Sequence, residues 1–194
     1  RKKAAFHTLG CKLNFAETSA ISRLFPEEQF EKVPASQAAD IYVINTCSVT
    51  DAADKKCRQA IKKFTRQSPG AFIAVVGCYA QLQPQKISSI PGVDLVLGTN
   101  EKYDIAAYIR EIEKKKKPEI HSCSLSESDT FNHSWSAGDR TRSFLKVQDG
   151  CDYSCSYCTI PLARGKSRNA DIASLAAEAE SIAAMGVREI VLTG

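Results

Sequence analysis

The sequence predicts an α/β protein, with a doubly wound parallel sheet over residues 1–117 and the truncated start of a second parallel βα unit over residues 140–194. Three observations predict it. Short, nearly continuous apolar runs alternate with helical segments, which is typical of parallel strands covered by helices on both faces. A polar, Ser-rich stretch at 118–139 separates two such series and is interpreted as a linker. The chain ends just after a strand, so we expect a barrel cut after its second strand.

The first unit is predicted to alternate strands and helices. A weak extended segment begins at Val33, and the strong strands lie at 4–9, 41–45, 72–76 and 94–97. In the first helix Ile21, Leu24 and Phe25 share one side, and Pro26 ends it. The helices are predicted at 14–25, 51–67, 84–90 and 102–117. Four lysines at 114–117 close the last one, either as a solvated helix end or as an RNA contact.

The second unit is predicted as a strand, a loop, a helix and another strand. The strand at 144–148 precedes a cysteine-rich loop, and a helix at 171–185 ends at Gly186 before the strand at 189–192. In parallel βα barrels the loops at the carboxyl ends of the strands carry the chemistry. We therefore expect the cysteine loop to be the active-site loop of this unit.

Composition sets broad limits on function. The chain has 194 residues, a net charge of +4 and eight cysteines. No apolar run approaches the roughly 20 residues of a membrane span, so we expect a cytoplasmic protein without a membrane partner. The α/β pattern does not suit a small disulfide scaffold, and cysteines in a reducing compartment more often bind metal or take part in catalysis. Cys57 and Cys123 have no predicted role.

The cysteine loop contains Cys151, Cys155 and Cys158, which are spaced CxxxCxxC, with Tyr157 before the last of them. Three closely spaced thiolates are good ligands for an iron–sulfur cluster or for zinc. A four-iron cluster held by three cysteines would leave one iron open. Zinc sites usually take four protein ligands, and no fourth Cys or His lies close by. The alternatives are a zinc knuckle or three structural cysteines.

A second set of cysteines is distributed along the first unit. Cys11, Cys47 and Cys78 each follow the carboxyl end of a predicted strand, 36 and 31 residues apart. In a parallel sheet these strand ends lie side by side at the ligand-binding edge. The sequence therefore predicts a second three-cysteine site, with Gly10 and Gly77 allowing close backbone approach. The alternative for each cysteine alone is a small buried hydrophobe.

Two asparagines lie near this second set. Asn14 and Asn45 could donate hydrogen bonds around the site, or serve only in turns and caps.

Four motifs together resemble the methylthiotransferases of the radical S-adenosylmethionine (SAM) superfamily. Of the three branches of that family, the form GCKLN with Glu17 and Thr18 looks like the branch that modifies threonylcarbamoyladenosine in tRNA. The other branches act on isopentenyladenosine in tRNA or on a ribosomal protein, and both remain alternatives, as does a metal-binding module without catalysis. The motifs are TLGCKLN at 8–14, NTCSVT at 45–50, VGCYAQ at 76–81 and QDGCDYSCSYCTIPLARG at 148–165.

The resemblance implies a function. Cys151, Cys155 and Cys158 would hold the 4Fe–4S cluster that cleaves SAM in a radical SAM barrel, here truncated and therefore expected to be inactive alone. Cys11, Cys47 and Cys78 would hold an auxiliary 4Fe–4S cluster that carries sulfur. A second SAM would supply the methyl group, a reducing electron donor is needed, and the substrate would be the tRNA anticodon loop rather than DNA.

The resemblance also implies secondary contacts. Tyr157 and Gly194 are expected near the bound SAM. An anticodon adenine is unpaired and can enter a pocket at modest cost. Five basic residues around the cysteine loop could hold RNA phosphates, or be surface charge or SAM partners. They are Arg140, Arg142, Arg164, Lys166 and Arg168.

Overall fold

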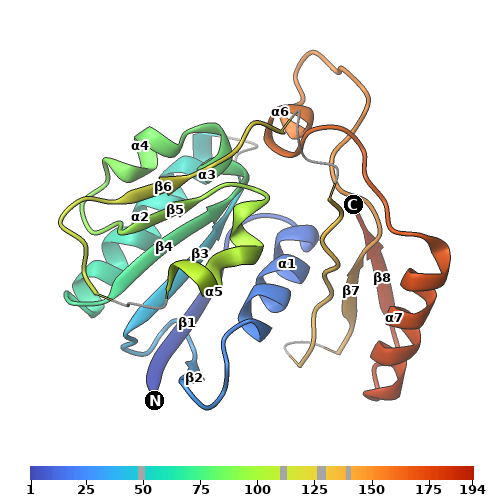
Figure 1. Cartoon of the computed structure of the whole chain (residues 1–194), viewed down its shortest axis with the longest axis horizontal. Coiled ribbons are helices and arrows are strands. Elements are labelled where there is room, and N and C mark those ends of the chain that lie inside the picture. Colours follow the sequence, from blue (N-terminus) through green and yellow to red (C-terminus); the bar gives the residue numbers. More distant parts are fainter. Residues whose placement is uncertain (48–50, 110–112, 126–129, 139–140) are drawn as a thin grey trace.

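The computed structural model describes residues 1–47, 51–109, 113–125, 130–138 and 141–194. Within these residues, six strands form one parallel sheet in the order β2-β1-β3-β4-β5-β6, and two more form a separate parallel pair (Figure 1). The predicted α/β class and the parallel sheet are confirmed. The six strands are β1 (Lys2–Thr8), β2 (Phe30–Val33), β3 (Ile41–Thr46), β4 (Phe72–Gly77), β5 (Leu95–Leu97) and β6 (Glu119–His121).

Helices cover both faces of the sheet, as a doubly wound fold requires. The alternation of side chains along β3 shows this directly: Tyr42 and Ile44 pack with the helices of one face, while Ile41 and Val43 pack with those of the other. All four side chains are fully buried, which explains why the strand is a continuous apolar run. One face carries α2 (Asp51–Gln67), α3 (Cys78–Leu82) and α4 (Pro84–Ser88), and the other carries α1 (Lys12–Arg23) and α5 (Ile105–Tyr108).

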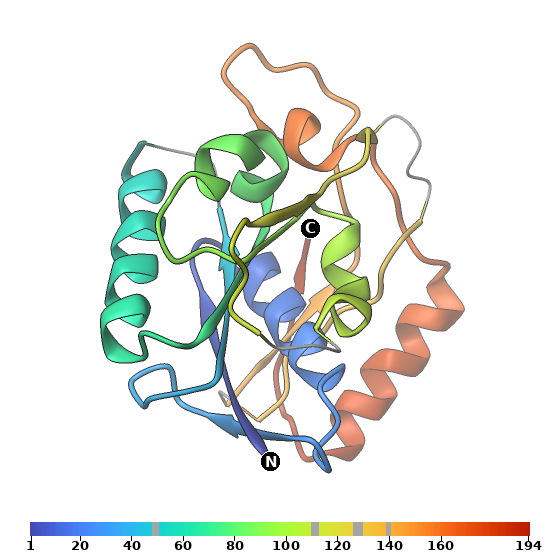
Figure 2. The same cartoon turned by 60° about the vertical axis from the view of Figure 1, so that its left-hand side comes forward.

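The second pair of strands lies beyond α1. It consists of β7 (Ser143–Lys146) and β8 (Ile190–Thr193), joined through α6 (Ile160–Arg164) and α7 (Ile172–Ala184). Figures 1 and 2 show α1 lying between the large sheet and this pair. On α1, Phe15 meets Phe144 of β7 edge to face, with ring centroids 5.9 Å apart. The helix therefore packs against both units of the chain.

The predicted helix at 102–117 is confirmed only in its first half, since helical structure covers 101–108, residues 110–112 lie outside the described part of the chain, and 113–117 are not helical. A single 3-10 turn, η1 (Glu101–Asp104), leads into α5, which ends at Tyr108. Lys114 is not helical. Its Nζ donates hydrogen bonds to the carbonyls of Ala71 and Gly92 (3.0 and 2.6 Å) and to Oδ2 of Asp94 (2.7 Å). The first lysine of the run is thus anchored to the sheet, and neither the solvated helix end nor the RNA contact describes it.

The stretch interpreted as a linker contributes a strand. Residues of β6 pair with β5 in parallel, from Leu95–Glu119 to Leu97–His121. Three residues with a single apolar side chain carry too little pattern to predict a strand, and only the exposed edge of the sheet selects them. Among the described residues, no helix is both long enough and apolar enough to cross a bilayer.

Candidate metal centre

The three strand-end cysteines meet at one edge of the large sheet. Cys11 directly precedes α1, Cys47 follows β3, and Cys78 opens α3 after β4. The strands β1, β3 and β4 are neighbours, so their carboxyl ends adjoin. Cys47 and Cys78 are buried, whereas Cys11 is exposed. Topology thus gathers thiols that lie far apart in the sequence.

A cavity of about 570 Å³ joins the two sets of cysteines. Cys11, Cys47 and Cys78 line one part of its wall, and Cys151 and Cys158 line another. These five thiols come from both βα units, so two separately predicted sites open into one space. Cys155, the sixth predicted ligand, is exposed and does not line the cavity.

The glycines beside the cysteines allow close contacts within the protein. Gly10 has φ +117°, and a Cβ placed on it would lie 2.5 Å from Cβ and 3.1 Å from Sγ of Cys47. Gly77 has φ +99°, and its Cβ would lie 2.4 Å from Oδ1 of Asn45. Both backbone conformations strongly favour glycine. At both glycines, the position that a Cβ would occupy is therefore crowded by atoms of neighbouring residues of the protein itself.

The chemistry of the donors fits iron–sulfur ligation. Among the described residues, no three His, Cys, Asp or Glu side chains converge closely enough to hold a single metal ion. Each cysteine of a four-iron cluster binds its own iron, so such a site needs soft thiolates around a space rather than around one point. Five cysteines line this cavity and provide donors of that kind.

The side chains of Asn14 and Asn45 form hydrogen bonds that connect the segments around Cys11. Nδ2 of Asn14 donates to the carbonyls of Leu9 (2.9 Å) and Thr46 (3.0 Å), and Sγ of Cys11 lies 3.8 Å from its Oδ1. Nδ2 of Asn45 donates to the Asn14 carbonyl at 3.0 Å. Asn14 therefore joins the loops of the first cysteine set, while Asn45 holds α1 against β3.

A buried ion cluster, made of Glu17, Lys102, Lys146, Asp149 and Arg164, lies behind the cavity. Each of these residues is at most 3% exposed. Nζ of Lys102 lies 2.6 Å from Oε2 of Glu17, and Nζ of Lys146 lies 2.6 Å from Oδ2 of Asp149. Arg164 binds both carboxylates, and it also lines the cavity. The sequence pattern alone missed this cluster, although a lysine inside the apolar run of β7 was a signal that it needed a buried partner.

The cluster shifts the ionisation of its members. Burial raises the pKa of Glu17, but the surrounding cations outweigh burial and hold that pKa well below its usual value. Burial lowers the pKa of Arg164, but the negative charge of Glu17 outweighs burial and holds that pKa well above its usual value.

The five basic residues predicted to contact RNA differ in their exposure to solvent. Arg164 and Arg168 are 2% and 8% exposed and pair with buried carboxylates, so their assignment to RNA phosphates is wrong for this structure. Arg142 is half exposed and pairs with Glu189 at 3.2 Å, and Lys166 is exposed. Arg140 lies outside the described residues.

Of the two residues expected near SAM, Gly194 lines the cavity and Tyr157 does not. Tyr157 is 91% exposed and does not line the cavity. Gly194 does line it, directly after β8 and next to Gln148, which follows β7. The structure therefore places the end of the second strand, and not the side chain of Tyr157, at the cavity.

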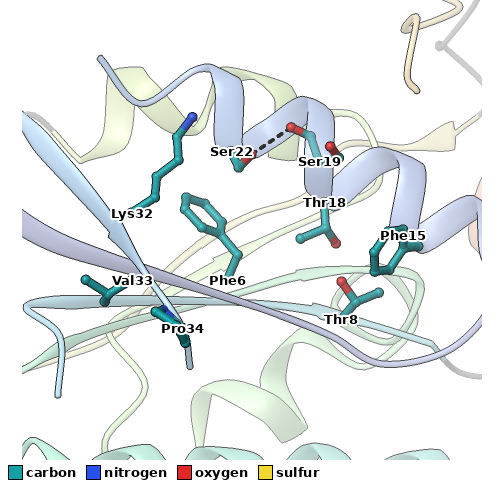
Figure 3. Close-up of a pocket in the computed structure, with 9 residues that line it drawn as sticks. All are labelled: Phe6, Thr8, Phe15, Thr18, Ser19, Ser22, Lys32, Val33 and Pro34. Atoms are coloured by element: carbon teal, nitrogen blue, oxygen red, sulfur yellow. Dashed lines mark hydrogen bonds between the residues drawn. The ribbon is translucent and has the colours of Figure 1, made fainter. Parts of the chain in front are cut away.

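A second cavity, of about 530 Å³, lies between α1 and the strands β1 and β2 (Figure 3). Its hydroxyl groups are largely engaged within the protein: Oγ1 of Thr18 donates to the Asn14 carbonyl and Oγ of Ser22 donates to the Ser19 carbonyl, both at 2.8 Å. It contains no cysteine. The thiol-lined cavity is therefore the better candidate for chemistry.

Comparisons with known proteins show what the chain is similar to. Residues 3–98 match the family described as "Uncharacterized protein family UPF0004". The chain is similar to two proteins named "Threonylcarbamoyladenosine tRNA methylthiotransferase MtaB", with 43% identity over 192 residues in Bacillus subtilis (strain 168) and 38% over 194 residues in Aquifex aeolicus (strain VF5). These alignments cover 98% and 99% of this chain, but 43% and 47% of those proteins.

A relative from another branch is also similar. The chain is 30% identical over 201 residues to "Ribosomal protein uS12 methylthiotransferase RimO" of Chloroflexus aurantiacus, covering 95% of this chain and 44% of that protein. The chain thus spans less than half the length of these curated relatives.

Proposed function

The chain belongs to the radical SAM methylthiotransferase family, and from this we propose that the whole protein adds a methylthio group to C2 of threonylcarbamoyladenosine next to the anticodon of tRNA. One observation carries the proposal: cysteines from two different βα units line the same cavity. A reaction that joins radical chemistry to sulfur insertion needs both sites to face one substrate. The similarity to two MtaB proteins favours this tRNA branch over the ribosomal one.

We assign the ligands as the motifs predict them. Cys11, Cys47 and Cys78 would hold the auxiliary 4Fe–4S cluster, and Cys151, Cys155 and Cys158 the cluster that binds SAM. When bound, one cluster would supply the electron that cleaves SAM to a radical, and the other would carry the sulfur. The protein ligates them and orients the adenine in the cavity, and the burial of its walls limits the access of water to the reacting atoms.

Metal loading tests the proposal. After anaerobic reconstitution with iron and sulfide, we expect the chain to bind about eight irons, as two four-iron clusters require. Cys47→Ser removes a buried ligand and should leave about four irons, since the other site is intact. Iron and sulfide are measured by colorimetric assay, together with the absorbance of the brown protein. The exposed Cys123, changed to Ser, is the matched control and should bind as much iron as the wild type.

Other outcomes are informative. Colourless protein that holds zinc would contradict the proposal and favour a metal-binding module without catalysis. Substrate choice is tested separately, with the full-length gene deleted from its host. Loss of the 2-methylthio derivative of threonylcarbamoyladenosine from tRNA nucleosides, measured by mass spectrometry, is expected. Loss of a modification on a ribosomal protein instead would support the other branch.

A basic helix supports an RNA partner. The segment α2 contains six Lys or Arg residues and two Asp, and it begins four residues after Cys47. Its apolar side is buried against the sheet through Cys57, Ile61 and Phe64, so that face is not free to enter a membrane. The basic residues exposed on the opposite side are Lys55, Lys56, Lys62, Lys63 and Arg66. We propose that this face contacts tRNA phosphates, together with Arg142 and Lys166.

Salt dependence tests this surface. Changing Lys55, Lys62 and Arg66 to Gln should weaken tRNA binding and lower the slope of log K against log salt concentration by about 2 to 3, because each lost phosphate contact removes about 0.7 to 0.9. Binding is measured by fluorescence anisotropy at several salt concentrations. Neutralising three exposed lysines of β1 and β2 is the matched control, and an equal loss there would contradict the assignment. These lysines are Lys2, Lys3 and Lys32.

A further inference from the structure

Arg164 lies where the two sets of cysteines meet. It ends α6, the short helix that follows Cys158, and its side chain lines the cavity although the residue is only 2% exposed. Four hydrogen bonds join its two Nη atoms to three side chains on two different βα units. We propose that Arg164 is the positioning residue that holds the two sets of cysteines at a fixed separation across the cavity.

One branch of the contacts reaches the first set. A terminal nitrogen of the guanidinium donates to Oδ1 of Asn14 at 3.0 Å. Because this oxygen accepts from a cation, Nδ2 of the same amide turns to the carbonyls of Leu9 and Thr46. These carbonyls lie two residues before Cys11 and one residue before Cys47. The guanidinium thus orients the amide that ties the two cysteine-bearing loops together.

A second branch reaches the cysteine loop of the other unit. Nη1 donates to Oδ1 of Asp149 at 2.9 Å, two residues before Cys151. The backbone reinforces this closure, since the N–H of Cys151 donates to the carbonyl of Gly165 at 3.1 Å. Arg164 itself follows Cys158 by six residues. One side chain therefore joins the beginning and the end of the segment that contains all three cysteines.

The third branch connects the two units directly. Nη1 and Nη2 donate to Oε1 and Oε2 of Glu17 at 2.8 and 3.0 Å, a two-pronged pair on the helix that begins after Cys11. A planar guanidinium can serve Glu17, Asn14 and Asp149 at once, because its donors form a rigid fork. A lysine ammonium keeps the charge but lacks that geometry. Arg164→Lys therefore separates positioning from charge balance.

Cross-linking of the metal-free chain tests the inference. A short phenylene bismaleimide joins thiols that lie close together, and mass spectrometry of the digested protein identifies the pairs. In the wild type we expect links between the sets, from Cys11 or Cys47 to Cys151 or Cys158. In Arg164→Lys the initial yield of these links should fall about tenfold, equivalent to about 1.4 kcal/mol of lost alignment. Links within one set, such as Cys151 to Cys158, should keep their yield.

Internal controls decide the outcome. Arg142→Lys alters a half-exposed arginine of the same unit, paired with Glu189, and should change neither yield. Unchanged links between the sets in folded Arg164→Lys would overturn the proposal, and so would an equal fall within and between them, which indicates general loosening. If that variant does not fold, Asn14→Asp keeps an acceptor for Arg164 but loses both donors, and the same fall between the sets is expected. The assay uses thiols alone, so its failure is distinct from failure to bind iron, although the role of the separation in catalysis rests on the proposed function.

Discussion

Replacing Glu17 by Gln should lower the free energy of unfolding by about 3–5 kcal/mol, the range found when one partner of a buried ion pair is removed. The carboxylate of Glu17 contacts Lys102, Lys146 and Arg164, and all of these side chains are at most 2% exposed. Without it, three buried cations would share the charge of Asp149 alone within this cluster. Urea denaturation followed by circular dichroism measures the change. Glu31→Gln, at an exposed position on β2, is the control and should stay within about 0.5 kcal/mol of the wild type.

The same variant predicts a dependence on pH. The pKa of Glu17 is lowered in the folded protein, so its contribution to stability is present above the unfolded pKa and is lost as the pH falls through the folded value. The difference in unfolding free energy between the wild type and Glu17→Gln should therefore stay constant from pH 7 down to the unfolded pKa of about 4.5 and shrink only below it. A difference that stays constant down to the acid unfolding of both proteins would contradict an ionised Glu17.

Replacing Gly150 by Ala should cost about 3 kcal/mol or more, as the sum of backbone strain and overpacking. Gly150 has φ +76°, and an added Cβ would lie 2.2 Å from the carbonyl oxygen of Lys166 and 2.5 Å from that of Gly165. Both are backbone atoms, so no side chain can turn aside. The cysteine loop would have to open at Cys151, and iron bound at that loop should fall as well.

A glycine with the same constraint but open space isolates the clash. Gly186 has φ +84°, and nothing lies within 4 Å of an added Cβ. Gly186→Ala should therefore cost only the left-handed backbone penalty, about 1–2 kcal/mol. Thermal and urea unfolding of both variants measure the difference. An equal decrease in the free energy of unfolding for the two variants would contradict this prediction. It would show that the cysteine loop can move to accommodate the added Cβ.

The sequence allowed the fold to be predicted where one local pattern had one structural solution. The run at 72–76 could only be a central strand, and β4 is buried at every position. The same reasoning located the cysteines, because the carboxyl end of a parallel strand has a fixed edge. Where the pattern was short or polar, as in β6, the strand could not be predicted from the local sequence. Its structure is set by pairing with β5.

The buried ion cluster marks the other limit of prediction. A glutamate in an amphipathic helix and an arginine beside a cysteine loop both suit a surface, so the sequence alone suggests RNA as a partner of Arg164. Its true partners lie 147 and 150 residues away in the sequence, at Glu17 and Asn14. Hydrophobic periodicity describes residues only a few positions apart, so it cannot predict contacts across such a separation in the sequence. Only the packing of α1 between the two sheets brings these groups together.

That placement of α1 has a consequence for how the chain folds. During synthesis α1 emerges before β7, so one of its sides remains uncovered until β7 has left the ribosome. Until then Glu17 would lack Lys146 and Arg164, which belong to the later unit. The first unit should therefore gain its full stability only when the second is made, and the two should unfold in a single cooperative transition rather than as independent modules.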